Sequence, residues 1–474
     1  MDIPVFHLDF LNNRVLIAVI AILHVVINHA MAVGGIPLVV YLERRAIKSR
    51  DEAWDELAYR ILKVFFISTT TVGALTGVGI WFSASLVNPY AIGSLLRVFF
   101  WTWFTEWMIF VTEVALILAY YLTWKKLSHP RKLAHLRLGR VLAVASWLTM
   151  SLIVSILSFM MDPGAWRTNK TLFSGMLNPV YGPQLAFRTP LAMVMAGVAA
   201  LCITASVTKR GSDLRAQAVQ ALSRWVLAWI PLCVLGGYWY ARAIPASMTG
   251  NVPVALLTQA LAAWSRTALQ VLAGASALVA VIAAWGALRP ATLRTPALVV
   301  SAALTLGLVG TFERVREFIR KPYAIADYLY SNGIRKADYP LLQRDGLLAH
   351  ATYTRVRTIN ADNHVDAGRE VFILACTRCH TVDGVNGVKG LLQAMYGNDA
   401  HWDPSAIAGF IGIMHTARPF MPPFPGSMLE RAALGEYLAS LQFHSDPIDG
   451  AQVSGVQAPA FAPPANLAAV AAQP

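Results

Sequence analysis

Long runs of apolar residues recur along the first two thirds of the chain. Crossing a hydrocarbon core of about 30 Å takes about 20 helical residues, and each run is long enough to do so. The runs lie at about 14–42, 61–87, 95–123, 139–161, 186–208, 219–243, 254–287 and 296–319. They predict an all-α membrane bundle of about eight helices. The first run is too long for a signal peptide and lacks a basic leader, so we expect it to stay in the membrane.

The polar segments between these runs alternate in charge. Lys and Arg gather at about 44–50, 125–140, 209–215 and 289–294, whereas 84–94, 162–185 and 241–253 carry few. The positive-inside rule places the basic segments in the cytoplasm. We therefore expect the N-terminus outside and, with an even number of spans, the C-terminus outside as well. Much of the net charge of +13 then reflects topology, which argues against nucleic acid as a partner.

Composition agrees with a multi-pass protein of a bacterial inner membrane. Of 474 residues, 56% are hydrophobic and 14% charged, whereas soluble domains are about 25% charged. These values exclude a disordered chain, a disulfide-stapled miniprotein and an ordinary cytosolic enzyme. Cys202 and Cys233 lie in the predicted spans, where small apolar packing is the default expectation.

The region after the last run predicts a separate unit that carries heme. We divide the chain into a membrane domain at 1–320, a tether at 321–360, a compact domain at 361–443 and a disordered Ala/Pro-rich tail at 444–474. The compact domain contains Cys376-Thr377-Arg378-Cys379-His380, the spacing of covalent c-type heme attachment. Cys376 and Cys379 would hold the porphyrin, and His380 would be the proximal iron ligand. Heme attaches to such thiols on the outer, periplasmic face, which agrees with the predicted topology.

A second axial ligand is expected downstream, because a low-spin electron-transfer heme often uses a Met thioether. Met421 opens the segment Met421-Pro422-Pro423-Phe424, whose prolines stiffen a loop. Met414 and His415 stay open as alternatives. An amphipathic helix at 427–441 would close the domain, which resembles a class I cytochrome c.

Ionisable residues inside membrane spans are costly and usually functional. The spans carry His24 and His29, with Glu106 and Glu113 two helical turns apart on one face. Near the outer end of the last span lies Glu317, at a depth similar to that of His24. Imidazole and carboxylate groups can bind iron or move protons.

These positions resemble subunit I of the cytochrome bd quinol oxidases. The matching segments are His24, Gly73-Ala74-Leu75-Thr76-Gly77, Glu106 with Glu113, Trp124, Leu177-Asn178-Pro179-Val180, and Glu317-Phe318-Ile319-Arg320-Lys321-Pro322-Tyr323. The resemblance covers about 1–330 in patches. It implies a buried, non-covalent heme pair of b and/or d type and a second, similar-sized membrane subunit.

The same resemblance implies roles for individual residues. His24 would be an axial ligand in the heme pair, and Glu317 would bind the iron of the other heme. Glu106 and Glu113 would lie on the heme d side and on the proton path. Arg320 would bind a heme propionate.

The sequence departs from the family where quinol oxidation takes place. The family's low-spin heme b uses a His at the position of Phe187-Arg188-Thr189-Pro190 and a Met near 264–269, and both ligands are missing. The quinol loop shrinks to about 244–253, and the family's last helix is absent. His29 has no counterpart in the pattern; it would either ligate a heme or hydrogen-bond within a helix interface.

Each of these residues also has a purely structural interpretation. His24 could pack between helices, and Glu106 and Glu113 could pair with Arg97 or a loop base. Glu317 could pair with Arg314 or Arg320. Arg188, at the mouth of a span, is more often an anchor that reaches toward the interface.

We expect a heme-containing oxidoreductase subunit. Electrons would enter from a periplasmic donor through heme c, reach the buried heme pair and reduce O₂ or a similar small molecule. The alternative is a non-catalytic, membrane-anchored electron-transfer cytochrome. A third hypothesis is an anchor without membrane hemes. The carboxyl pair favours the first, because O₂ reduction consumes protons whereas an electron conduit needs no proton path.

Overall fold

The computed structural model describes residues 5–126, 129–448 and 450–451, and it divides into two compact units. The membrane unit comprises 16–85 and 90–331. The second unit, here called the outer unit, comprises residues up to Val15, the short segment 86–89 and everything from Asn332 onward. The predicted disordered tail lies almost entirely outside the described residues.

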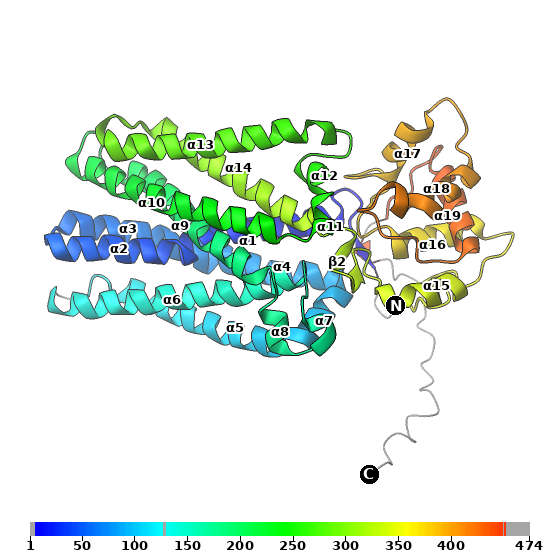
Figure 1. Ribbon diagram of the computed structural model, residues 1–474, viewed down its shortest axis with the longest axis horizontal. Helices are drawn as coiled ribbons and strands as arrows, with labels where there is room; N and C mark the ends of the chain where they lie inside the picture. Colours follow the sequence, from blue (N-terminus) through cyan, green and yellow to red (C-terminus); the bar gives the residue numbers. More distant parts are fainter. Residues whose placement is uncertain (1–4, 127–128, 449, 452–474) are drawn as a thin grey trace, which may run out of the picture. The chain divides into compact units, whose positions relative to one another are not determined.

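The membrane unit is a helical bundle, and eight of its helical segments are long and apolar enough to span a membrane (Figure 1). The predicted number of spans and the all-α class are confirmed. The spans are α1–η1–α2 (Asn13–Ile27, Asn28–Val33, Gly35–Ser49), α3–η2–α4 (Glu52–Ser68, Thr69–Gly73, Ala74–Val87), α5 (Pro89–Thr123), α6 (His129–Phe159), α9 (Tyr181–Val207), α10 (Asp213–Ala243), α13 (Ser265–Leu288) and α14 (Thr295–Ile319).

Short elements connect these spans. They are α7 (Trp166–Asn169), α8 (Leu172–Met176), α11 (Ala246–Thr249), α12 (Val252–Leu256), η3 (Ala262–Trp264) and η4 (Pro290–Thr292). The strands β2 (Tyr323–Ile325) and β3 (Leu329–Tyr330) form an antiparallel pair after α14. The seventh predicted span, expected from 254, begins only at 262. Residues 252–256 form the separate short helix α12, and the amide of Asn251 just before it donates to Ile319 O and Lys321 O at the end of α14.

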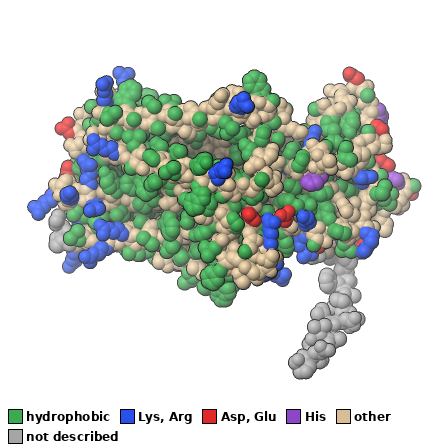
Figure 2. Space-filling view, in the orientation of Figure 1, with side chains coloured by type: hydrophobic (Ala, Val, Ile, Leu, Met, Phe, Trp, Pro, Cys, Tyr) green, Lys and Arg blue, Asp and Glu red, His purple; other side chains and the backbone are tan. Residues whose placement is uncertain are grey.

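Helix α9 is the most buried span, and it packs closely on α10. A Cβ on Gly236 would lie 2.3 Å from Ala186 O, and one on Gly197 would lie 2.5 Å from a Val226 methyl. Only glycine permits this approach of the two backbones. On the surface of the membrane unit, Lys and Arg gather at the end of the bundle where α2, α3 and α6 meet their basic loops (Figure 2). The sides of the helices are mainly hydrophobic.

The outer unit is built on crossing helices. Its elements are β1 (Phe6–His7), η5 (Lys336–Asp338), α15 (Tyr339–Asp345), α16 (His364–Ala375), α17 (Val388–Tyr396), α18 (Pro404–Ala417), α19 (Met428–Ser440) and β4 (Gly450–Ala451). Helix α19 begins with a capping box between Ser427 and Glu430. Helices α16 and α18 both pack on α19. The helix expected at 427–441 is therefore present as α19, with each end shifted by one residue.

Segment 321–360, which we expected to be a tether, is folded instead. It contains β2, β3, η5 and α15, and Leu347 and Leu348 are buried. Their backbone N–H groups donate to the buried Glu430 carboxylate at 2.8 and 2.7 Å. The polar composition of this segment suggested a linker, but its polar groups are used in specific hydrogen bonds.

The outer unit draws on three distant parts of the chain. Strand β1 pairs with β4, and Asp9 and Asn12 bond to Val382 N and Val385 O. Val87, between the second and third spans, accepts from the Arg378 side chain. The three segments of this unit lie before span one, after span two and after span eight. They can be on the same side of the membrane only if an even number of spans separates them. The internal contacts of this unit thus agree with eight spans.

We predict that Gly368→Ala destabilises the outer unit. A Cβ at Gly368 would lie 2.1 Å from Ala433 O, so α16 and α19 would have to separate, at a cost of about 2 kcal/mol. Limited proteolysis of the purified chain should then cut the outer unit faster. Gly409→Ala on α18 is the control, because a Cβ there meets nothing within 4 Å. Equal protease resistance of the two variants would contradict the close packing.

Candidate functional site

The Cys376–His380 motif forms a turn directly after α16. Both Cys379 N and His380 N donate to Cys376 O at 3.0 Å, and the two thiols form no disulfide. Burial raises the pKa of the Cys376 thiol to about 12 and lowers the pKa of His380 to about 4. The His380 imidazole is therefore neutral near pH 7.

The neutral His380 ring is oriented by the loop that follows it. Its Nδ1 lies 3.2 Å from both Asn386 O and the Asn386 side-chain nitrogen, and in the tautomer with the proton on Nδ1 this proton donates to the carbonyl. Nε2 then carries a lone pair, which is the arrangement typical of metal-binding histidines. Asn386 adopts a left-handed backbone and also donates to Cys379 O at 2.7 Å. The donor set and its orientation fit a covalently attached heme.

Other segments of the outer unit hold this motif in place. Arg378, between the two cysteines, is buried and donates to Val87 O at 3.2 Å. Asp9 accepts from Val382 N at 2.6 Å, two residues after His380. A Cβ on Gly384 would lie 2.0 Å from Asp9 O, so the N-terminal segment packs tightly against this loop.

The expected distal segment is fixed by a histidine. His415 Nδ1 donates to Met421 O at 2.6 Å, and Met421 N donates to Arg418 O at 2.8 Å. Prolines 422 and 423 follow, and Phe424 is buried. This bond holds the Met421 backbone against α18, and Met414 and His415 stay open as alternative ligands. Met414 lies on α18.

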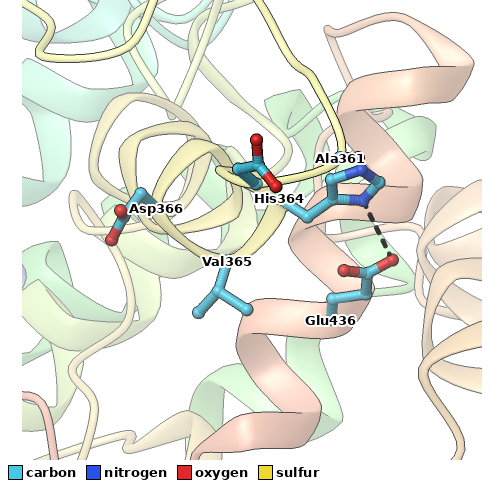
Figure 3. A pocket seen from close by; sticks show the side chains of 6 residues that line it. Ala361, His364, Val365, Asp366 and Glu436 are labelled. Atoms are coloured by element: carbon cyan, nitrogen blue, oxygen red, sulfur yellow. Dashed lines mark hydrogen bonds and ion pairs between the residues drawn. The ribbon is translucent and has the colours of Figure 1, made fainter.

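A surface depression lies elsewhere on the outer unit (Figure 3). Within it, His364 Nδ1 pairs with Glu436 at 3.2 Å. Its lining residues are Ala361, Asp362, His364, Val365, Asp366 and Glu436. His364 begins α16 and the cysteine motif follows its end, so the two are separated by the length of the helix, about 18 Å. The depression is therefore not part of the cysteine motif.

In the membrane unit, His24 is surrounded by the glycine-rich segment of the second span. Its Nδ1 lies 3.1 Å from Gly73 O and 3.3 Å from Thr76 Oγ1. A Cβ on Gly77 would lie 3.0 Å from His24 Cε1, so glycine makes room for the ring. Asn28 also contacts the ring, with its amide nitrogen 2.9 Å from Nδ1. The sequence segments that we grouped with His24 thus meet in space.

Two π-helical turns contact each other at this place. They are η1 (Asn28–Val33) and η2 (Thr69–Gly73), and Gly73 packs against the Asn28 amide. Such turns insert one residue into a helix and are frequent at functional sites. They distinguish this region from the regular helices around it.

Glu317 and Arg320 form an ion pair at the end of α14. The Glu317 side chain is 41% exposed, whereas Arg320 is buried and also donates to Ala324 O. Arg320 Nε has no acceptor among the described residues. A buried guanidinium N–H without an acceptor fits a carboxylate ligand such as a propionate.

Arg188 is the main surprise of the membrane unit. We expected it to reach toward the interface, but only 1% of its surface is exposed, so that expectation is wrong. Its guanidinium lies 2.7 Å from Glu313 Oε1, and Arg316 Nε lies 2.9 Å from Glu313 Oε2. The low dielectric of the bundle favours such a pair over isolated charges, which explains why Arg188 turns inward.

His29 belongs to this same charged cluster. Its Nε2 lies 3.2 Å from Arg188 Nη1. A guanidinium can only donate, so Nε2 is the unprotonated nitrogen and the ring is neutral. Of the two roles left open for His29, hydrogen bonding within a helix interface is the one observed. Iron ligation through Nε2 would require release of Arg188.

The two carboxyls of α5 differ in their partners. Glu113 accepts from Ser146 at 2.5 Å and from Thr149 at 3.2 Å, both on α6. These hydroxyls take the place of the pairing with Arg97 that we had considered. Glu106 lies two turns along the same face and is half-buried. The two carboxyls thus lie about 10.5 Å apart along the axis of α5.

Sequence reasoning missed one buried cluster near the basic loops. His135 Nδ1 lies 2.5 Å from Glu43 Oε1, and Tyr120 donates to Glu43 Oε2 at 2.6 Å. All three side chains are buried. We had started the fourth span at 139, which left His135 in a loop. The signal was Glu43, a single acid among the arginines that end the first span.

Comparison with known proteins addresses the membrane unit. Residues 13–247 match the family model of cytochrome bd terminal oxidase subunit I. Over these residues the chain is similar to cytochrome bd oxidase subunit I. A structure of the bd oxidase from Geobacillus thermodenitrificans aligns with a TM-score of 0.55. The alignment covers 67% of this chain and 89% of that one, at 16% identity, which shows a shared fold. Among curated protein sequences, none matches the chain.

The buried cluster of Arg188, Glu313 and Arg316 can be tested by substitution. Replacing Glu313 with Gln would leave Arg188 and Arg316 without a counter-charge, at a cost of about 3–5 kcal/mol. Arg188→Gln should cost less, because Arg316 still neutralises Glu313. Thermal unfolding of the purified protein in detergent should therefore rank E313Q well below R188Q.

The control for this comparison is Glu56→Gln. Glu56 is exposed and pairs with Arg60 and Lys125, so its loss should change stability by less than about 0.5 kcal/mol. Equal melting of E313Q and E56Q would contradict the charge assignment.

Proposed function

We propose that this chain is a heme-containing membrane oxidoreductase subunit fed by a one-electron carrier rather than by quinol. The outer unit would be a cytochrome c domain, with heme held by Cys376 and Cys379 and iron bound by His380 and Met421. The membrane region would hold a pair of hemes of b and/or d type. Bound heme would supply electron carriage in the outer unit and O₂ reduction, or reduction of a similar small molecule, in the membrane.

The observation that carries the proposal is the geometry of the Cys376–His380 turn. Two free thiols and an imidazole with a directed Nδ1 donor stand on one helix end, which suits covalent heme. Contacts with Asp9 and Val87 tie this turn to segments on the same side of the bundle. By the positive-inside rule this is the periplasmic side, where a soluble donor would reach it.

Within the membrane region, the proposed roles follow from position. His24 and Glu317 would bind iron, and Arg320 would bind a propionate. Glu113, held by two hydroxyls, and Glu106 would move protons toward the site. A second membrane subunit resembling subunit II of bd oxidases would complete the complex.

The loss of quinol as the electron donor is supported by Arg188. At the position where the family places a heme-binding His, this side chain forms a buried ion pair with Glu313. The segment corresponding to the quinol loop is reduced to α11 and α12, held against α14 by Asn251. Electrons would therefore enter through the outer unit.

The first test concerns the covalent heme. His380→Ala should remove low-spin heme c, and Cys376→Ser together with Cys379→Ser should abolish heme staining on denaturing gels. Met421→Ala should convert the heme to a high-spin or low-potential form. His350→Ala, an exposed His paired with Asp345, should leave the spectrum unchanged. A low-spin, high-potential heme c in the Met421 variant would contradict that ligand.

The second test concerns the membrane hemes and the reaction. The reduced-minus-oxidised spectrum and extracted hemes of the purified chain should show b or d heme beside heme c. His24→Ala should lose non-covalent heme, because it removes a proposed ligand. Gly310→Ala, where a Cβ meets nothing within 4 Å, is the control. Heme c alone would favour the non-catalytic electron carrier.

Oxygen consumption separates the electron donors. Reduced soluble cytochrome c should support turnover that a quinol does not support. Rapid quinol-driven turnover without a soluble cytochrome would overturn the proposed entry of electrons through the outer unit.

A further inference from the structure

A buried charged layer lies one helical turn deeper than the proposed iron ligands. It contains His29, Arg188, Glu313 and Arg316, all in the membrane unit. His29 lies five residues after His24, or about 7.5 Å along the helix axis. Glu313 lies four residues before Glu317, or about 6 Å along the axis of α14. The first span and α14 run in opposite directions, so both steps lead to the same depth.

This layer joins the helices that carry the proposed ligands. Arg188 Nη1 contacts His29 Nε2 at 3.2 Å, and the same guanidinium contacts Glu313 at 2.7 Å. Arg188 on α9 therefore links the span of His24 to the helix of Glu317. Its side chain also lies over the Phe312 ring, at 5.2 Å from the centroid.

The layer carries one positive charge in excess. His29 is neutral, because its Nε2 accepts from Arg188, and Glu313 is the single carboxylate between Arg188 and Arg316. Arg188 Nε and Arg316 Nη1 have no acceptor among the described residues. The neighbouring Arg320 is balanced by Glu317. Only 1% of Arg188 and 6% of Glu313 are exposed, so water and salt screen this charge weakly.

We propose that Arg188 and Arg316 raise the reduction potential of the irons that His24 and Glu317 would bind. This inference rests on the proposed function, since it requires heme at His24 and Glu317. An iron centre loses one positive charge when it is reduced, so a buried cation nearby favours the reduced form. Arg188 is thus a positioning and potential-setting residue. The segment Phe187-Arg188-Thr189-Pro190, where the resembling family places a heme ligand, thus carries a fixed charge in this chain.

Spectroelectrochemical titration of the full-length protein, with any membrane partner that co-purifies, tests this proposal. Arg188→Lys keeps the charge, Arg188→Gln keeps an N–H donor without the charge, and Arg188→Met keeps neither. We expect the potential of the non-covalent hemes to fall equally in R188Q and R188M and to stay near the wild-type value in R188K. The heme c potential should not move in any of them.

A role in positioning alone predicts another pattern. R188Q would then resemble R188K and the wild type, and R188M alone would change the heme spectrum; this result would overturn the electrostatic proposal. Arg316→Gln repeats the measurement with the Arg188–Glu313 pair intact and should lower the potential as well. The R316Q measurement also replaces the R188Q measurement if the R188Q protein fails to retain heme.

Arg167→Gln is the charge-matched control. This exposed arginine pairs with Asp162 and Asp327 at the surface, so its removal should leave the potential unchanged. A wild-type protein without non-covalent heme would overturn the proposed function and this inference together. Heme-loaded R188Q and R316Q proteins with unchanged potentials would overturn the inference alone.

Discussion

The ion pair between Arg188 and Glu313 is a buried charge contact that constrains the packing of the membrane unit. It joins α9 to α14, and through His29 it also holds the first span. A charge inside a bundle must find a partner or destabilise the fold, so the three helices can pack at only one depth relative to each other. The depth of His24, Glu317 and Arg320 follows from this register. The glycines of α9 and α10 then allow the backbones to approach around it.

The sequence predicted the span count because a hydrocarbon core of about 30 Å imposes a length that apolar runs reveal directly. It also identified the Cys376–His380 motif by its spacing, although not the turn that the motif forms after α16. His24 lies beside Gly73, Thr76 and Gly77, residues that were grouped with it although periodicity alone does not bring two spans together. That grouping came from resemblance, and the family match of residues 13–247 agrees with it.

The errors have a shared cause. Arg188 was expected at the interface and segment 321–360 was expected to be a tether, because both are polar. Polarity along the chain does not reveal a partner that is distant in sequence: Glu313 for Arg188, and Glu430 for the backbone of Leu347 and Leu348. His135 was missed for the same reason, since its partner Glu43 lies in another span. Buried polar pairs depend on tertiary contacts, which a single sequence does not display.

The outer unit is built from distant segments of the chain, and this has a consequence for biogenesis. The loop after His380 packs against residues near the N-terminus, and Arg378 binds the segment between the second and third spans. The first and last parts of the chain to be synthesised must therefore meet after all eight spans are inserted. Contacts so distant in sequence form slowly. Maturation of the outer unit is consequently a late step, and a chain truncated before its C-terminal third leaves its N-terminal segment without these contacts.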